Sequence, residues 1–271
     1  MPQNEAVSTD SVLTKARLLW EDLAAAPGAF GADGEVSVVV SPHASTCPPG
    51  WIGIVVLGGQ AVVTVPDSRT AEEVRTALAR VSIDHLTDPA QLGTVLPIAE
   101  TIGPAALAYV DQLSFQPLPV AQPIEHLPAD HRDLRALESE AGHEDAAEAG
   151  LDALTSPAFV LRSGEKVVAA AGYEAWPMRT AHLSILTAPA HRGRGLARAI
   201  ASAAVAHALA AGLFPQWRAR VPQSRAVARA LGFRELGAQL CVRLDHPALH
   251  RAQRAGSARI LHAPDGFRAE G

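Results

Sequence analysis

Residues 183–197 read LSILTAPAHRGRGLA, an apolar run followed by a turn that contains two glycines. The pattern predicts a strand that enters a tight turn, and the alanine-rich sequence after it predicts a long helix over about 195–211. The first amides of a helix have no partner within the helix and carry partial positive charge. The turn therefore predicts a phosphate-binding site at the start of this helix.

Two glycines and two arginines suit this turn to phosphate. Gly193 and Gly195 allow the backbone to approach a pyrophosphate closely, and Arg192 and Arg194 supply donors for phosphate oxygens. A P-loop needs a lysine after its last glycine, and the turn has none. A dinucleotide-binding turn needs a third glycine where this chain has Arg198. Both common phosphate loops are therefore excluded.

Arg192, Gly195 and Ala197 have the spacing R-x-x-G-x-A. This spacing resembles the pyrophosphate loop of the GNAT superfamily of N-acetyltransferases, which reads (Q/R)-x-x-G-x-(G/A). The resemblance covers about residues 118–244, nearly half of the chain. It is supported by two earlier predicted strands, by the proline three residues before the motif, by the alanine-rich helix after it, and by Leu231-Gly232-Phe233 at the end of the next helix.

Within that superfamily, the arrangement is similar to the zwittermicin-resistance type and to related two-part bacterial acetyltransferases. These proteins carry an extra N-terminal domain and a P-x-W-R strand, which here reads Pro215-Gln216-Trp217-Arg218. The resemblance implies an α/β (α+β) fold, with a mixed, strongly twisted sheet flanked by helices. The N-terminal half is expected to be a smaller α+β domain that covers one side of the acceptor cleft.

Four prolines mark a change of composition between the two halves, at Pro117, Pro119, Pro123 and Pro128. We therefore predict an N-terminal domain over 1–114, a GNAT-like domain over 115–245 and a loose tail over 246–271. Hydrophobic periodicity predicts helices at about 11–26, 71–81, 130–141, 144–154, 195–211 and 224–231. It predicts strands at 36–40, 51–57, 60–65, 158–162, 167–176, 181–187, 216–220 and 234–244, and it leaves 99–110 open between helix and strand.

The resemblance also implies which residues bind the acetyl donor, acetyl-coenzyme A. Leu186 and Thr187 match the strand positions whose backbone lies along the pantetheine arm. The pyrophosphate would lie on the turn, against Arg192, Gly193, Arg194, Gly195, Leu196 and Ala197. The thioester would lie where the strand that begins at Gln216 diverges from the strand that ends at Thr187. No metal is implied.

Two positions depart from the family pattern. Val221 stands where many relatives have an asparagine that assists cofactor binding, and Ala228 stands where many have a tyrosine that protonates the leaving thiolate. A thiolate leaves readily, so the loss of the acid slows the reaction without preventing it. The two departures keep an alternative open, which is a coenzyme A-binding sensor without catalysis. A structural protein that binds no coenzyme A is a weaker alternative.

Direct transfer of the acetyl group to an amine requires a general base. Glu174, late on its strand, and His182, on the neighbouring strand, are the candidate catalytic residues. Each also has a simpler interpretation as a residue on the surface of the sheet. The acidic sequence after about 138 has the same two interpretations, a solvated pair of helices or a surface that attracts a cationic amine. His143, Glu144 and Ser156 are the candidate acceptor contacts.

The composition limits the class of protein. The 271 residues are 48% hydrophobic and have a formal net charge of −5, which argues against a basic nucleic-acid-binding surface. Cys47 and Cys241 have neither metal-ligand nor disulfide spacing and are expected to be free thiols. We see no signal peptide and no stretch that could span a membrane. We therefore expect a cytoplasmic protein whose partners are a small amine acceptor and, in a homodimer, a second copy of the chain.

Overall fold

The computed structural model describes residues 3–118 and 123–245, and for residues 3–10 it describes the backbone alone. The predicted tail over 246–271 and Pro119 lie outside the described residues. The helices are α1 (Gln3–Leu23), α2 (Ser68–Leu78), α3 (Pro89–Leu92), α4 (Arg132–Ala141), α5 (His143–Ala149), α6 (Leu196–Ala210) and α7 (Pro222–Ala230). Among the described residues, no helix combines the length and the apolar character that crossing a membrane requires.

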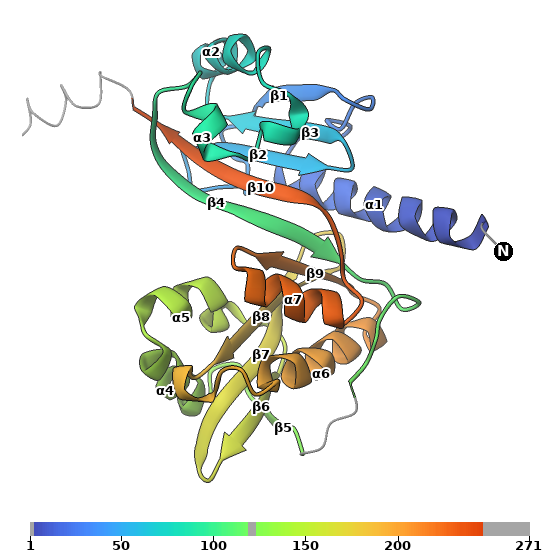
Figure 1. The fold of residues 1–271 in the computed structure, drawn as a ribbon, viewed down its shortest axis with the longest axis vertical. Coiled ribbons are helices and arrows are strands. Elements are labelled where there is room, and N and C mark those ends of the chain that lie inside the picture. The colour runs from blue at the N-terminus through green and yellow to red at the C-terminus, as the bar shows by residue number, and fades with distance from the viewer. Residues whose placement is uncertain (1–2, 119–122, 246–271) are drawn as a thin grey trace, which may run out of the picture.

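The strands are β1 (Val36–Val40), β2 (Ile52–Leu57), β3 (Gln60–Val65), β4 (Ile98–Tyr109), β5 (Glu125–Leu127), β6 (Ala158–Ser163), β7 (Lys166–Trp176), β8 (Thr180–Thr187), β9 (Phe214–Ala219) and β10 (Arg234–Leu244). They form one ten-stranded sheet in the order β1-β3-β2-β10-β4-β9-β8-β7-β6-β5 (Figure 1). The β1–β3 and β8–β9 pairs are parallel and the others are antiparallel. The sheet is therefore mixed, as predicted.

Helices cover both faces of this sheet because the strands alternate apolar side chains between two cores. On β7, Ala171 and Tyr173 pack in the core beneath α6, whereas Val168 and Ala170 pack in the core beneath α4. Farther along the sheet, α1 packs through Leu19 and Trp20 against β2 and β4. The predicted mixed α/β fold with flanking helices is thereby confirmed.

Strand β10 joins the two halves of the chain. It pairs with β2 on one side and with β4 on the other, although it is the last strand in the sequence. Gly237 allows the close approach of β2, because a Cβ atom at this position would lie 1.8 Å from the Val56 carbonyl oxygen. The sheet thus continues across the predicted boundary at 114/115, and the division into domains stays a prediction.

Two elements differ from their predicted form for local reasons. The region 99–110, left open between helix and strand, is strand β4, in which Pro104 lies between two segments that both pair with β10. Proline in the interior of a helix removes a hydrogen bond and clashes with the preceding turn. The helix predicted over 144–154 ends at Ala149, because Gly150 adopts a left-handed conformation with φ of 62°. A short 3-10 turn, Leu151–Ala153, follows it.

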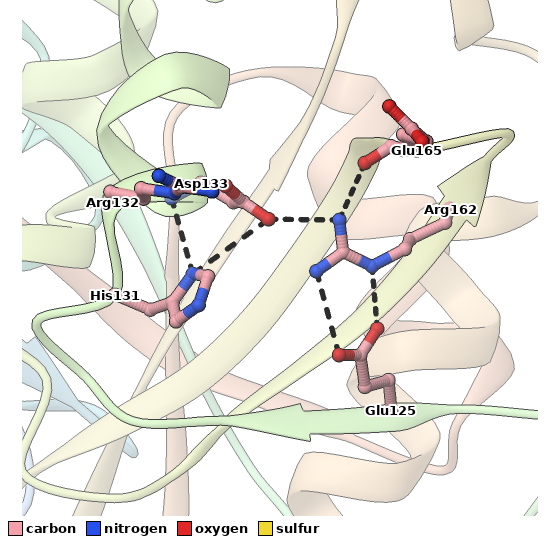
Figure 2. A network of polar contacts seen from close by, with 6 residues as sticks. All are labelled: Glu125, His131, Arg132, Asp133, Arg162 and Glu165. Atoms are coloured by element: carbon pink, nitrogen blue, oxygen red, sulfur yellow. Dashed lines mark hydrogen bonds and ion pairs between the residues drawn. The ribbon is translucent and has the colours of Figure 1, made fainter.

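A network of charged side chains connects α4 and β5 to β6. Arg162 on β6 donates from Nε to Glu125 Oε2 (2.5 Å) and from Nη1 to the Glu165 carbonyl oxygen (2.6 Å), and Nη1 also lies 2.8 Å from Asp133 Oδ2. Figure 2 shows this guanidinium at the centre of the network, with His131 beside Asp133. Hydrogen bonds from Arg162 lower the pKa values of the Glu125 and Asp133 carboxyl groups. One side chain therefore holds three segments together.

Candidate functional site

The site begins where two neighbouring strands separate. Strands β8 and β9 pair in parallel at only three positions, the last of which is His182 with Gln216. Beyond that point β8 continues beside β7 and β9 continues beside β4. The edge of β8 that faces β9 after His182 therefore has no strand partner in the described ranges 3–118 and 123–245, and its backbone groups are available to a ligand. The predicted divergence of the two strands is confirmed.

A pocket of about 470 Å³ occupies this gap. It is bounded by the end of β8, by the turn and first residues of α6, by β9 and α7, and by α5. Of the residues predicted to hold acetyl-coenzyme A, the pocket is lined by Leu186, Thr187, Arg192, Gly193, Gly195, Leu196 and Ala197. Arg194 is exposed on the same turn and does not line the pocket.

The turn before α6 leaves open space in front of the helix. Gly193 and Gly195 have φ values of +75° and +76°, a conformation that L-amino acids with a side chain rarely adopt. A Cβ atom at either position would meet no atom within 4 Å. Among the residues that the structure describes, no side chain caps the first turn of α6, whose N-cap residue is Gly195. The first amides of a 15-residue helix thus face the pocket without a side-chain acceptor.

Three polar atoms of residues that line the pocket are buried without a hydrogen-bond partner in the described part of the chain. They are Thr187 Oγ1, His191 Nδ1 and Arg198 Nε. A buried polar atom without a partner destabilises the protein, so such atoms are rare unless a ligand or water satisfies them. Together with the free helix amides, these atoms fit a ligand that carries many acceptor oxygens, such as a pyrophosphate.

Arg192 is held in place by two contacts. Its Nη2 lies 2.5 Å from Asp145 Oδ2 on α5, and its Nε donates to the Thr187 carbonyl oxygen at 3.3 Å. Both Arg192 and Asp145 are partly exposed and line the pocket. The predicted phosphate donor is therefore paired with a carboxylate of α5, the acidic helix that also lines the pocket.

The two candidate catalytic residues lie together on the face of the sheet that carries α5. Glu174 on β7 is directly opposite His182 on β8. Trp176 links them, since its Nε1 donates to Glu174 Oε2 at 2.8 Å and its ring stacks on His182 with centroids 4.0 Å apart. His182 Nδ1 donates to Gln216 Oε1 at 2.5 Å. Burial, aided by the charge of Arg218, lowers the His182 pKa to about 4, so the imidazole is neutral at neutral pH.

The three candidate acceptor contacts are placed differently from one another. His143 and Glu144 are exposed on the first turn of α5, outside the residues that line the pocket. Ser156 is buried, and its hydroxyl accepts from the Tyr173 amide (2.9 Å) and donates to the Pro157 carbonyl oxygen (2.9 Å). Of the acidic sequence, Asp145 and Glu148 line the pocket instead. Their spacing of three residues on one helix face is the signal that could have selected them.

Two residues of β9 were also missed as site residues. Trp217 and Arg218 both line the pocket, one from each face of the strand. Trp217 Nε1 donates to Ser224 Oγ on α7 at 2.9 Å, and its ring packs edge-on against Phe233. Trp217 is otherwise buried in the core beneath α6. Val221, the departure from the family pattern, is an exposed lining residue, whereas Ala228 is buried.

Comparison with known proteins identifies the family of this region. Residues 157–238 match the family model described as GNAT acetyltransferase. This stretch contains β7 to β9, the turn, α6 and α7, and thus most of the pocket. A search of curated proteins found no match.

Solved structures of GNAT-family proteins resemble the chain at low identity. A protein from Novosphingobium aromaticivorans is 22% identical, and the match covers 54% of this chain and 65% of that protein, with a TM-score of 0.42. The chain therefore spans slightly less than two thirds of that protein's length. One from Colwellia psychrerythraea is 15% identical over 72% of this chain and 81% of its own (TM-score 0.45). One from Streptococcus suis is 15% identical over 86% of this chain and 99% of its own (TM-score 0.46). Residues 157–238, which form the C-terminal part of the sheet and most of the pocket, are thus similar to the GNAT acetyltransferase family.

Proposed function

We propose that this protein is an N-acetyltransferase that transfers an acetyl group from acetyl-coenzyme A to the amine of a small acceptor in a ternary complex. The observation that supports the proposal most is the continuity of one pocket, from the free amides of α6 to the gap between β8 and β9. A long donor with a pyrophosphate at one end and a thioester at the other requires such a pocket.

The residues of the turn and of β8 divide the binding of the donor between them. The α6 amides, Thr187 and Arg198 offer hydrogen bonds and positive charge to the pyrophosphate. The unpaired edge of β8 from Leu183 onward offers backbone groups to the amides of the pantetheine arm. Trp217 and Val227 supply apolar contact along the same path. The thioester then lies near His182 and Gln216, where the strands meet.

Transfer forms a bond between the amine nitrogen and the acetyl carbon and breaks the bond between that carbon and sulfur. The proton lost by the amine passes to Glu174, directly or through water, and coenzyme A leaves as a thiolate. His182 is a poor base at neutral pH because its pKa lies near 4, so it positions Trp176 and Gln216 instead. Ala228 is buried and cannot act as a general acid. The thiolate therefore departs without being protonated by this position.

The test measures binding and thiol release separately. Acetyl-coenzyme A is titrated into the protein by calorimetry, and free thiol is then assayed with a panel of small amines. We expect binding at one site and acetyl transfer to at least one amine. Binding without turnover on any amine would favour the sensor over the enzyme.

A matched variant tests the role of Glu174. Replacing it, Glu174→Gln, keeps the acceptor oxygen for Trp176 but removes the base. We expect kcat to fall by about a hundredfold or more while the affinity for acetyl-coenzyme A stays the same. An unchanged kcat would remove Glu174 from this role.

A further inference from the structure

Arg218 differs from two other arginines near the pocket. Arg192 is ion-paired with Asp145 and Arg220 with Glu148. In the described part of the chain, no carboxylate lies within ion-pair distance of Arg218, and its hydrogen bond is to a neutral group, from Nη1 to Gln239 Oε1 at 3.4 Å. This contact is long for a hydrogen bond to a guanidinium, which has five donors to satisfy.

The surroundings of Arg218 are those of a binding cleft. Arg218 is exposed on β9 and lines the pocket, and partial desolvation by the surrounding protein lowers the pKa of its guanidinium. A charged group in such a place is stabilised by an opposite charge more strongly than on an open surface. Arg218 also lies two residues beyond Gln216, where the strands separate and where the proposed function places the thioester.

The acidic residues that could attract a cationic acceptor are already neutralised. Asp145 and Glu148, the two carboxylates of α5 that line the pocket, each hold an arginine. Among the charged groups that influence Arg218, Glu174 is the carboxylate without an ion pair, and it raises the pKa of Arg218. Near the end of the β8–β9 pairing, one arginine and one carboxylate are therefore without an ion-pair partner in the described chain: Arg218, which lines the pocket, and Glu174, which lies opposite His182 outside that lining.

We propose that Arg218 is the binding group for an anionic group of the acceptor, so that the acceptor carries a carboxylate as well as the amine that is acetylated. The inference rests on the proposed function and specifies its substrate class as amino acids and related zwitterions. Arg218 takes the carboxylate in a bidentate contact. The amine then lies on the side of Glu174, which accepts its proton, and Gln239 holds the guanidinium in position.

The test compares acceptors that differ in the carboxylate alone. Lysine is assayed beside cadaverine, and phenylalanine beside phenethylamine, by release of coenzyme A thiol. We take the pair in which the natural protein is more active. Within that pair, we expect kcat/KM for the amino acid to exceed kcat/KM for the decarboxylated amine about tenfold or more. In Arg218→Met, this preference disappears through a rise in KM for the amino acid, whereas the decarboxylated amine changes little.

Two controls separate binding from folding. Arg229→Met removes an exposed arginine of α7 that does not line the pocket, and it should keep the preference. Thermal stabilisation of Arg218→Met by acetyl-coenzyme A should equal that of the natural protein, which shows that the variant is folded. Equal or faster acetylation of the decarboxylated amines would overturn the inference and leave the proposed function intact. If the protein binds acetyl-coenzyme A but acetylates neither the amino acids nor the decarboxylated amines, both the inference about Arg218 and the proposed function would be overturned.

Discussion

At the scale of single residues, Gly195 is the position where the cofactor assignment can be separated from the fold. It precedes α6 with a positive φ and has open space in front of it. In Gly195→Leu, the side chain would occupy the space assigned to the pyrophosphate. We expect the affinity for acetyl-coenzyme A to fall at least about tenfold, together with a loss of stability of about 1–2 kcal/mol from the strained backbone. Calorimetric titration and thermal unfolding measure the two effects.

Gly164 provides the matched control for this variant. It also has a positive φ, +62°, and open space at its Cβ, but it lies in the turn between β6 and β7, away from the pocket. Gly164→Leu should show the same loss of stability with no change in affinity. If both variants bind acetyl-coenzyme A as well as the natural protein does, the pyrophosphate does not lie at the turn.

The sequence indicated the residues of the turn but not those that face it. A motif of local spacing is sufficient to select residues 192–197, because the backbone of one short segment makes the proposed site. Arg218 could not be selected in this way. The contact between Glu148 and Arg220 joins residues 72 positions apart, and only the fold shows that it leaves Arg218 without an ion-pair partner.

At the scale of elements, the Arg162 network makes the attachment of α4 and β5 depend on pH. The pKa values of Glu125 and Asp133 lie below their ordinary values of 4.5 and 3.8 because both carboxylates contact Arg162. Their contribution to stability is therefore present above these ordinary values and is lost as the pH falls below them. We expect the melting temperature of Arg162→Met to decline less steeply than that of the natural protein between about pH 5 and pH 3.

Differential scanning calorimetry at a series of pH values measures this difference. Arg243→Met is a suitable comparison, since Arg243 on β10 pairs with Glu100 on β4, several strands away from the Arg162 network. Parallel pH curves for Arg162→Met and the natural protein would contradict the role given to the network.

Element prediction succeeded where one local property dominated and failed where two competed. Strands β2 and β3, with Gly58-Gly59 between them, were predicted almost to the residue because the turn and the apolar runs agree. In α5, the acidic and alanine-rich sequence favours helix beyond Ala149, but Gly150 ends it. A prediction from hydrophobic periodicity is little affected by one glycine. It also cannot distinguish a helix from the 3-10 turn that follows, because either can bury Leu151.

At the scale of the whole molecule, the sequence predicted the type of fold and could not predict its continuity. A cluster of prolines between two globular regions is typical of a linker, and it lies where the chain leaves β4 for the second half. Nothing in the sequence of β10 specifies that it returns between β2 and β4. This pairing sets β4 beside β9, so the first half of the chain forms part of the sheet that carries the pocket (Figure 1).

The central claim is that acetyl-coenzyme A lies between the start of α6 and the gap between β8 and β9. Hydrogen exchange of backbone amides, measured with and without acetyl-coenzyme A, tests it across the whole chain at once. We expect slower exchange in residues 183–198 and 217–227 and unchanged exchange in β1 to β3, which lie at the far end of the sheet. Protection that omits Leu196 to Arg198, or that is concentrated in another part of the sheet, would contradict it.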